Sequence, residues 1–236
     1  RCLAYLSKMM NLAAKEWELR PDNPCLGVKR YPERKRERFF SDEDLQRIGA
    51  ALREAERRNS PHPSCIAAVR LLAVTGLRVS EALALTWDEV DLDRSCLRLR
   101  DAKAGSRTVP LGNAARVLLS SFERVGPFVL WGPDPKQAMS HWTVRKFWEG
   151  LRAQAKVKDG RLHDFRHTTG TYAAQTGANA FMVRDLLGHK TMAMTGRYVE
   201  RAVDPMRATA DAVAARVDAA MAGRTAKVVP LAKRRR

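Results

Sequence analysis

The sequence predicts a mainly α-helical fold with one small antiparallel β-sheet, and two observations support this prediction. Apolar residues recur at helical spacing along most of the chain, whereas strict alternation of apolar and polar residues surrounds one short loop. The alternating segments, 96–100 and 107–111, flank a loop that contains Gly105, which is typical of a β-hairpin. The chain has 236 residues, 45% of them hydrophobic, which is enough to bury a core.

The N-terminal part is expected to be separate from the main domain. Residues 1–19 have apolar positions at helical spacing, and the prolines of segment 20–24 end this predicted helix. A basic stretch, 29–38, then contains Pro32 and predicts an exposed linker. It is either a solvated charged turn or a strap that lies along DNA phosphates. Because the chain starts with Arg1, we expect a fragment or a processed product.

The main domain is predicted to begin at a helix cap. Ser41 is the expected N-cap, with Asp44 at the third helical position. Gly126-Pro127, Gly132-Pro133 and Asp159-Gly160 mark turns between later elements. The predicted helices are 42–58, 63–74, 80–85, 113–124, 140–157, 164–175, 179–187 and an Ala-rich helix after Pro205 that reaches about Met221.

Charge and composition limit the class of partner. Lys and Arg number 43 against 26 acidic residues, a net charge of +17, which favours binding to nucleic acid. A ribosome-associated protein and a membrane-surface binder are the alternatives at this point. The four cysteines are widely spaced, which argues against a zinc finger and a disulfide framework and fits a reducing cytoplasm. We find neither a charged leader nor an apolar run of about 20 residues, so we expect a soluble, cytoplasmic protein.

Three segments contain residues suited to phosphate chemistry. In the first, Gly76 allows a sharp turn that directs Arg78 from a helix start, and Glu81 lies three residues later, where it can hold the guanidinium. An Arg–Glu pair on a helix is also common as a purely structural feature. In the second, His163 and Arg166 are three residues apart and project from one helix face.

The third segment ends in a tyrosine. Leu186 and Leu187 are expected in the core, and Gly188 ends their helix and leaves His189 on the following turn. Tyr198 follows nine residues after that histidine, and taken alone it could be an ordinary core residue.

Together, and in this order, the segments resemble the tyrosine recombinase, or phage integrase, family. TGLRVSEALALTW, HDFRHTTGTYAAQTGA and LGHKTMAMTGRY are similar to its three signature regions, and DAKAGSRTVPLG is similar to its catalytic β-hairpin. The resemblance runs from about Arg38 to Tyr198. It implies an integrase-like catalytic domain at 41–204, a basic linker at 31–40, and a C-terminal helix and tail at 205–236. Residues 1–30 resemble the last helix of the preceding DNA-gripping domain.

The resemblance implies a role for each matching residue. Tyr198 would attack the scissile phosphate and form a 3′-phosphotyrosyl link, while Arg78 and Arg166 stabilise the transition state. Lys103 would protonate the departing 5′ oxygen, His163 would act as acid and base, and His189 would bind the phosphate. Glu81 would support the first arginine, and Asp164 would be a partner of these side chains. His167 is the competing histidine of the second segment, and we expect it either to be structural or to support the side chains that bind the phosphate.

The residue types fit this chemistry independently of the family. Two guanidiniums offset the charge of a phosphodiester, and a lysine acid assists the poor alkoxide leaving group. A free tyrosine has a pKa near 10, so its neighbours must stabilise the anion. The sequence has no acidic cluster for Mg²⁺ and no GxxxxGK[ST] motif, so we expect chemistry without metal, ATP or another cofactor.

The function expected from these observations is recombination of duplex DNA, in a bacterial or phage context. A type IB topoisomerase-like enzyme and an inactive DNA-binding module of the same fold are the alternatives. The expected partners are double-stranded DNA at a specific site, three further copies in a tetramer assembled on DNA from solution monomers, and an accessory DNA-bending protein. We expect association with the nucleoid but not with a membrane. The C-terminal helix would dock either on its own domain or on a neighbouring copy. Basic residues expected to contact DNA are Lys29, Arg30, Arg34, Lys35 and Arg36.

Overall fold

The computed structural model describes residues 2–29, 31, 38–58, 62–100, 105–199, 210–211, 213–218 and 221. The chain divides into two compact units, Arg1–Glu37 and Arg38–Arg236. The division falls within the basic segment that the sequence marks as a linker. Each unit is described by itself.

The first unit contains helix α1 (Cys2–Lys15) and a loop that folds back on it. The Asn23 amide donates to the Ser7 carbonyl and to Asn11 Oδ1, both at 2.9 Å, which ties the loop to the helix. The helix ends at Lys15 and not at residue 19 as predicted. Glu18 adopts a positive φ of 50°, a conformation that is incompatible with a continued helix.

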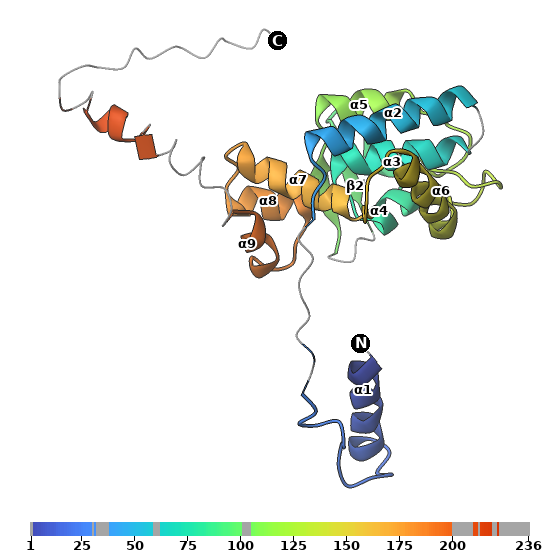
Figure 1. Cartoon of the computed structure of the whole chain (residues 1–236), viewed down its shortest axis with the longest axis vertical. Coiled ribbons are helices and arrows are strands. Elements are labelled where there is room, and N and C mark those ends of the chain that lie inside the picture. The colour runs from blue at the N-terminus through green and yellow to red at the C-terminus, as the bar shows by residue number, and fades with distance from the viewer. Residues whose placement is uncertain are drawn as a thin grey trace. The chain divides into compact units, whose positions relative to one another are not determined.

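The second unit is mainly helical with one small sheet, which confirms the predicted fold class (Figure 1). Its elements are α2 (Asp42–Arg58), α3 (Pro63–Thr75), α4 (Val79–Ala84), η1 (Trp87–Glu89), β1 (Val90–Asp91), β2 (Cys96–Leu99), β3 (Arg107–Pro110), α5 (Asn113–Ser120), α6 (His141–Gln154), α7 (Asp164–Gln175), α8 (Ala180–Leu187) and α9 (Ala193–Val199).

The sheet is antiparallel, in the order β1-β2-β3, with Leu97 opposite Val109 and Leu99 opposite Arg107. The predicted hairpin corresponds to β2 and β3. The short strand β1 was not predicted, because two residues are too few to show an alternating pattern. In β3, Val109 is buried while Thr108 and Pro110 are exposed, so Arg107 lies on the inward face with Val109.

Helix α3 forms the centre of the core and packs against α2, α5, α6 and α7. It begins at Pro63 behind the N-cap His62, and it ends where Gly76 takes a left-handed conformation with φ of 63°. A Cβ at Gly76 would lie 2.6 Å from Thr169 Oγ1. Only glycine therefore allows α3 to stop this close to α7.

An aromatic cluster fixes α7 against the core. Phe165 in α7 contacts Phe40 and Trp148, with ring centroids 4.7 and 5.3 Å apart. The Phe40 backbone N–H also donates to Thr168 Oγ1 at 2.9 Å. Because these contacts fix the helix in rotation, the adjacent Arg166 is held on a defined face.

Several predicted boundaries differ from the structure. Helices α5 and α6 end at Ser120 and Gln154 and are shorter than predicted. Helix α9 was not predicted, and its seven residues carry Tyr198. The predicted cap is present, since Ser41 Oγ accepts from the Asp44 N–H at 3.2 Å. Of the predicted Ala-rich C-terminal helix, the described residues 210–211, 213–218 and 221 are helical and exposed, and the rest lies outside the described residues.

Within the described part of the chain, no helix is both long and apolar enough to cross a membrane.

Candidate active site

The site begins at the turn between α3 and α4, where Glu81 holds Arg78. The Arg78 guanidinium donates to Glu81 Oε1, and the Arg78 backbone N–H donates to Glu81 Oε2 at 3.0 Å. The carboxylate therefore positions the guanidinium and also caps the start of α4. This is the arrangement that the spacing of the two residues predicts.

A second guanidinium shares that carboxylate. Arg107, at the start of β3, donates through Nη2 to Glu81 Oε2 at 2.8 Å, with its side chain 12% exposed and that of Glu81 4% exposed. Burial raises the pKa of Glu81, but the Arg78 N–H and the positive charge of Arg107 outweigh it, so that the pKa is lowered overall. The acid is therefore held as a carboxylate between two arginines.

Arg166 lies in the same group, beneath the ends of α3 and α8. It donates to the Gly76 carbonyl at 3.0 Å and to the Leu187 carbonyl, and it is 3% exposed. Burial, followed by repulsion from Arg78, lowers its pKa to about 10. Arg166 still carries its charge at neutral pH.

The C-terminal end of α8 accepts from all three arginines. The carbonyls of three consecutive residues each accept from one guanidinium. Arg107 donates to the Leu186 carbonyl at 3.3 Å, Arg166 donates to the Leu187 carbonyl, and Arg78 donates to the Gly188 carbonyl at 2.8 Å. Helix C-termini leave carbonyls unpaired and have a partial negative charge, which complements clustered cations. The helix end thus collects three positive charges at one place.

Gly188 is required for this arrangement. It takes a left-handed φ of 61°, and a Cβ there would lie 2.5 Å from Arg107 Nε. That nitrogen is buried and has no hydrogen-bond partner among the described residues. The absence of a side chain at Gly188 allows the Arg107 guanidinium to lie close to the end of α8.

Tyr198 is held on α9 in a small apolar cluster with Ala174, Val183 and Leu187, and it is 6% exposed. Its ring stacks beside His189, with centroids 6.1 Å apart and planes inclined by 15°. Its hydroxyl oxygen lies 2.7 Å from His167 Nδ1. The nucleophile predicted from the sequence is therefore next to α7, which carries Arg166.

The remaining predicted residues lie around this centre. His163 is the exposed N-cap residue of α7, and its ring is 5.1 Å from that of His167, centroid to centroid. Nδ1 of His189 lies 2.9 Å from Thr195 Oγ1. Asp164 is buried and accepts from the Arg161 N–H at 2.9 Å, so this contact fixes the turn before α7.

Of the basic residues predicted in the hairpin loop and the linker, only one lies among the described residues. Lys29 is exposed in the first unit. The others, Lys103, Arg30, Arg34, Lys35 and Arg36, lie outside the described residues.

Sequence reasoning missed two residues of this site, Arg107 and Thr195. Arg107 could have been found, because strand alternation places it on the same inward face as Val109. Thr195 is fully buried on α9, three residues before Tyr198, and no sequence pattern marks it. His167 was expected to be structural or to support the catalytic side chains, and it contacts the tyrosine hydroxyl directly.

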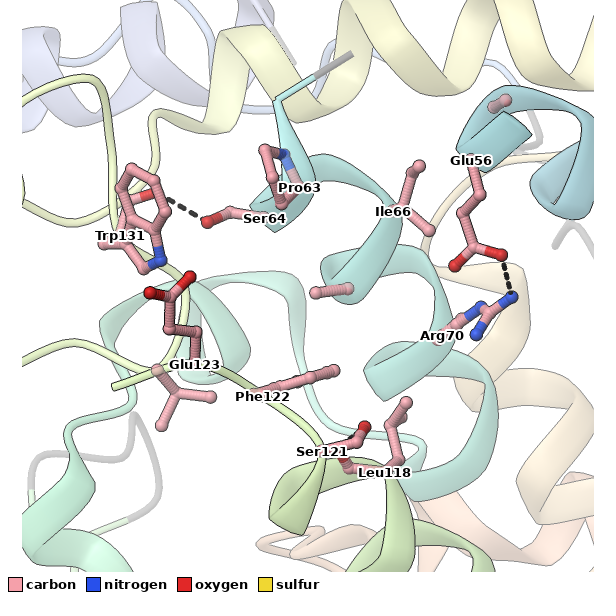
Figure 2. A pocket seen from close by; sticks show the side chains of 13 residues that line it. Glu56, Pro63, Ser64, Ile66, Arg70, Leu118, Ser121, Phe122, Glu123 and Trp131 are labelled. Carbon is pink, nitrogen blue, oxygen red and sulfur yellow. Dashed lines mark hydrogen bonds and ion pairs between the residues drawn. The ribbon is translucent and has the colours of Figure 1, made fainter. Parts of the chain in front are cut away.

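A cavity of about 340 Å³ lies elsewhere in the second unit and is lined by residues of α2, α3 and α5 and the loop after α5. Figure 2 shows its wall, where Arg70 pairs with Glu56 at 2.8 Å and Ser64 donates to the Trp131 carbonyl at 2.7 Å. None of the arginines, histidines or the tyrosine described above lines it.

Known proteins are similar to this chain in sequence and in fold. Tyrosine recombinase XerC of Mycobacterium sp. strain KMS is 34% identical over 160 residues, which cover 61% of this chain and 51% of that protein. The Tn1549 transposon integrase, solved in complex with transposon right end DNA, superposes with a TM-score of 0.68 at 18% identity, covering 82% of this chain and 72% of that one. Lambda integrase, solved as a tetramer bound to a Holliday junction, superposes with a TM-score of 0.66 at 20% identity, covering 83% of this chain and 57% of that one.

The chain spans about half the length of the curated relatives that it matches. The profile of the Phage integrase family matches residues 38–204, which is most of the chain. This chain therefore belongs to the phage integrase family of tyrosine recombinases.

Proposed function

We propose that this chain is a site-specific recombinase or integrase that cleaves and rejoins duplex DNA through a 3′-phosphotyrosyl intermediate on Tyr198, without metal or ATP. The observation that carries the proposal is the convergence of three distant segments. Arg78, Arg166 and His189 meet around the end of α8, and the tyrosine packs on that same helix.

The arginines would bind the scissile phosphate. Arg78 and Arg166 each have several N–H donors, and Glu81 fixes the first of them through its carboxylate. Donors fixed in this way stabilise the negative charge that develops on a pentavalent phosphorus, and a comparable donor contributes about 10²–10³ in rate. His189 would donate a further hydrogen bond to a non-bridging oxygen.

Proton transfer would involve a lysine and histidines. Lys103, in the loop between β2 and β3, would protonate the departing 5′ oxygen, and His163 would act as acid and base beside the phosphate. Asp164 would support these side chains by fixing the turn on which His163 lies. The phosphotyrosyl link would conserve the energy of the cleaved phosphodiester bond, so rejoining would require no nucleotide hydrolysis.

DNA would be bound through the positive charge of both units. The net charge of +17 favours phosphate contacts through counterion release. Residues 1–30 would be the end of a DNA-gripping domain, and Lys29, Arg30, Arg34, Lys35 and Arg36 would follow the backbone. The chain would assemble from monomers into a tetramer on its specific site, with a DNA-bending protein as an accessory factor. Lambda integrase, which is similar in fold and was solved as a tetramer bound to a Holliday junction, supports the tetramer.

The test is to trap the covalent intermediate. The chain would be incubated in EDTA with a pool of duplexes that have a randomised core and a nick close to the cleavage site. Cleavage then releases a short strand with a 5′ hydroxyl, and the loss of this strand prevents rejoining. A protein–DNA adduct that survives denaturation in wild type and is absent in Tyr198→Phe is expected. No adduct from any duplex, with salt-sensitive DNA binding retained, would instead favour the inactive DNA-binding module.

Relaxation of a supercoiled plasmid gives a second measurement. A topoisomerase-like enzyme would relax plasmids of any sequence at similar rates, whereas the proposed recombinase would act on those that carry the selected core.

A further inference from the structure

The hydroxyl of Tyr198 is in contact with one particular histidine. His167 Nδ1 lies 2.7 Å from the hydroxyl oxygen, within the range of about 2.6–3.2 Å expected between a general base and the atom that bears the proton it removes. His167 is half-buried, and its ring centroid lies 6.0 Å from that of Tyr198. The contact joins α7 to α9, two helices that are brought together only by folding.

Helix geometry explains how two adjacent residues of α7 reach different groups: His167 contacts Tyr198, and Arg166 lies with the other arginines. Successive residues of a helix point about 100° apart, so Arg166 faces the arginine group and His167 faces α9. Gly170 lies one turn after His167 on the same face. A Cβ there would be 2.9 Å from Tyr198 Cε1 and Cζ, so the glycine makes the space for the phenol ring.

Further contacts hold the Tyr198 ring beside His167. Tyr198 packs in the cluster of Ala174, Val183 and Leu187, and the ring of His189 stacks on it. His163 meets His167 edge to face, at 5.1 Å between ring centroids. The geometry therefore places His163 next to the histidine that contacts the nucleophile.

We propose that His167 is a catalytic residue that accepts the proton of Tyr198 during strand cleavage and returns it during rejoining, an inference that rests on the proposed function. In the tautomer with a proton on Nε2, Nδ1 accepts the hydroxyl proton as the phenol oxygen bonds to phosphorus and the P–O5′ bond breaks. The departing 5′ oxygen takes its proton from a separate acid. In rejoining, the conjugate base of that acid takes back the proton of the 5′ hydroxyl as its oxygen bonds to phosphorus, the bond between phosphorus and the phenol oxygen breaks, and the imidazolium returns its proton to the phenol oxygen.

The first test measures adduct formation by His167→Asn on the nicked duplexes selected with the wild type. Asparagine retains a hydrogen-bonding group near the hydroxyl but is not a base. We expect the rate constant at saturating DNA to fall by about 10²–10⁴, with DNA affinity unchanged, since general-base catalysis contributes that much. His62→Asn is the matched control, because His62 caps α3 away from the tyrosine and asparagine is a good N-cap.

A second measurement separates a base from a residue that only positions the ring. Fluorotyrosine at position 198 is more acidic than tyrosine and depends less on a base. At a pH where it is ionised, the deficit of His167→Asn is expected to shrink to about tenfold or less. A deficit that stays the same would assign His167 a positioning role and overturn the proposal.

A third measurement needs no DNA. In the free chain with ¹³Cζ-labelled tyrosine, the Tyr198 resonance is expected to shift in His167→Phe and to stay in place in His62→Asn. An unshifted resonance, or wild-type cleavage by His167→Asn, would overturn this inference while leaving the proposed function intact. Failure of the wild type to form any adduct would overturn the proposed function and this inference with it.

Discussion

Arg107 donates to Glu81 Oε2 at 2.8 Å, and the other oxygen of that carboxylate is bound by Arg78, so one buried acid fixes two arginines from separate elements. The ion pair connects the β-sheet to the turn between α3 and α4, and Arg107 also reaches the end of α8. The positions of the arginines therefore depend on one another.

Replacement of Arg107 is expected to destabilise the fold. Arg107→Ala leaves the buried Glu81 with one cationic partner and removes the contact to α8. Because breaking a buried ion pair costs about 3–5 kcal/mol, we expect a loss of this order in the free energy of urea unfolding. The control is Arg98→Ala on the neighbouring strand, whose pair with Asp91 is half exposed and is expected to contribute about 0–1 kcal/mol. Equal losses in the two variants would contradict the shared-carboxylate arrangement.

Gly188→Ala is expected to disturb the same group through sterics. A left-handed alanine costs about 1–2 kcal/mol by itself, and the added Cβ also meets Arg107. Gly177→Ala supplies the comparison, since Gly177 has a φ of 88° but no atom within 4 Å of its ideal Cβ. Thermal unfolding should show a larger loss at position 188 than at 177, and the excess measures the Arg107 contact. No excess would mean that Arg107 moves aside without cost.

Gly170→Ala is expected to displace Tyr198. Replacing glycine by alanine inside a helix normally stabilises it by up to about 1 kcal/mol. That gain is expected for Gly150→Ala in α6, where nothing lies within 4 Å of the new Cβ. At position 170 the new Cβ would meet the tyrosine ring, so we expect a loss of stability and a slower rate of adduct formation. Stabilisation of both variants alike would show that the ring can shift freely.

Glu81→Gln is expected to change how stability depends on pH. The folded-state pKa of Glu81 is below its ordinary value of 4.5, because the hydrogen bond from the Arg78 N–H and the charge of Arg107 outweigh burial. Such a group stabilises the folded state at pH above its unfolded pKa, and the contribution is lost as pH falls through the folded pKa.

The measurement is urea unfolding of wild type and variant between pH 7 and acid conditions. The difference in unfolding free energy is expected to be constant near neutrality and to decrease below about pH 4.5. A difference that does not depend on pH would show that Glu81 has the same pKa in the folded and unfolded chains.

Much of the fold could be predicted, because local patterns dictated it. The helix predicted at 164–175 matches α7, and the alternation around Gly105 gives β2 and β3. Helix α9 was missed because its seven residues have no clear apolar period. It is stabilised by packing of Tyr198 and the buried Thr195 against α7 and α8, contacts that no local pattern encodes.

The sequence by itself determined which chemistry is present: two spaced arginines, their acid, the histidines and the tyrosine, together with the glycines that end α3 and α8. The tertiary structure alone decided how these groups meet. Arg107 joins the site because its side chain reaches from β3 to Glu81 in α4 and to the Leu186 carbonyl at the end of α8. His167 and not His163 lies at hydrogen-bond distance from Tyr198. The reason is physical: helix and strand periods fix directions within an element, whereas distances between elements are set by the packing of a shared core.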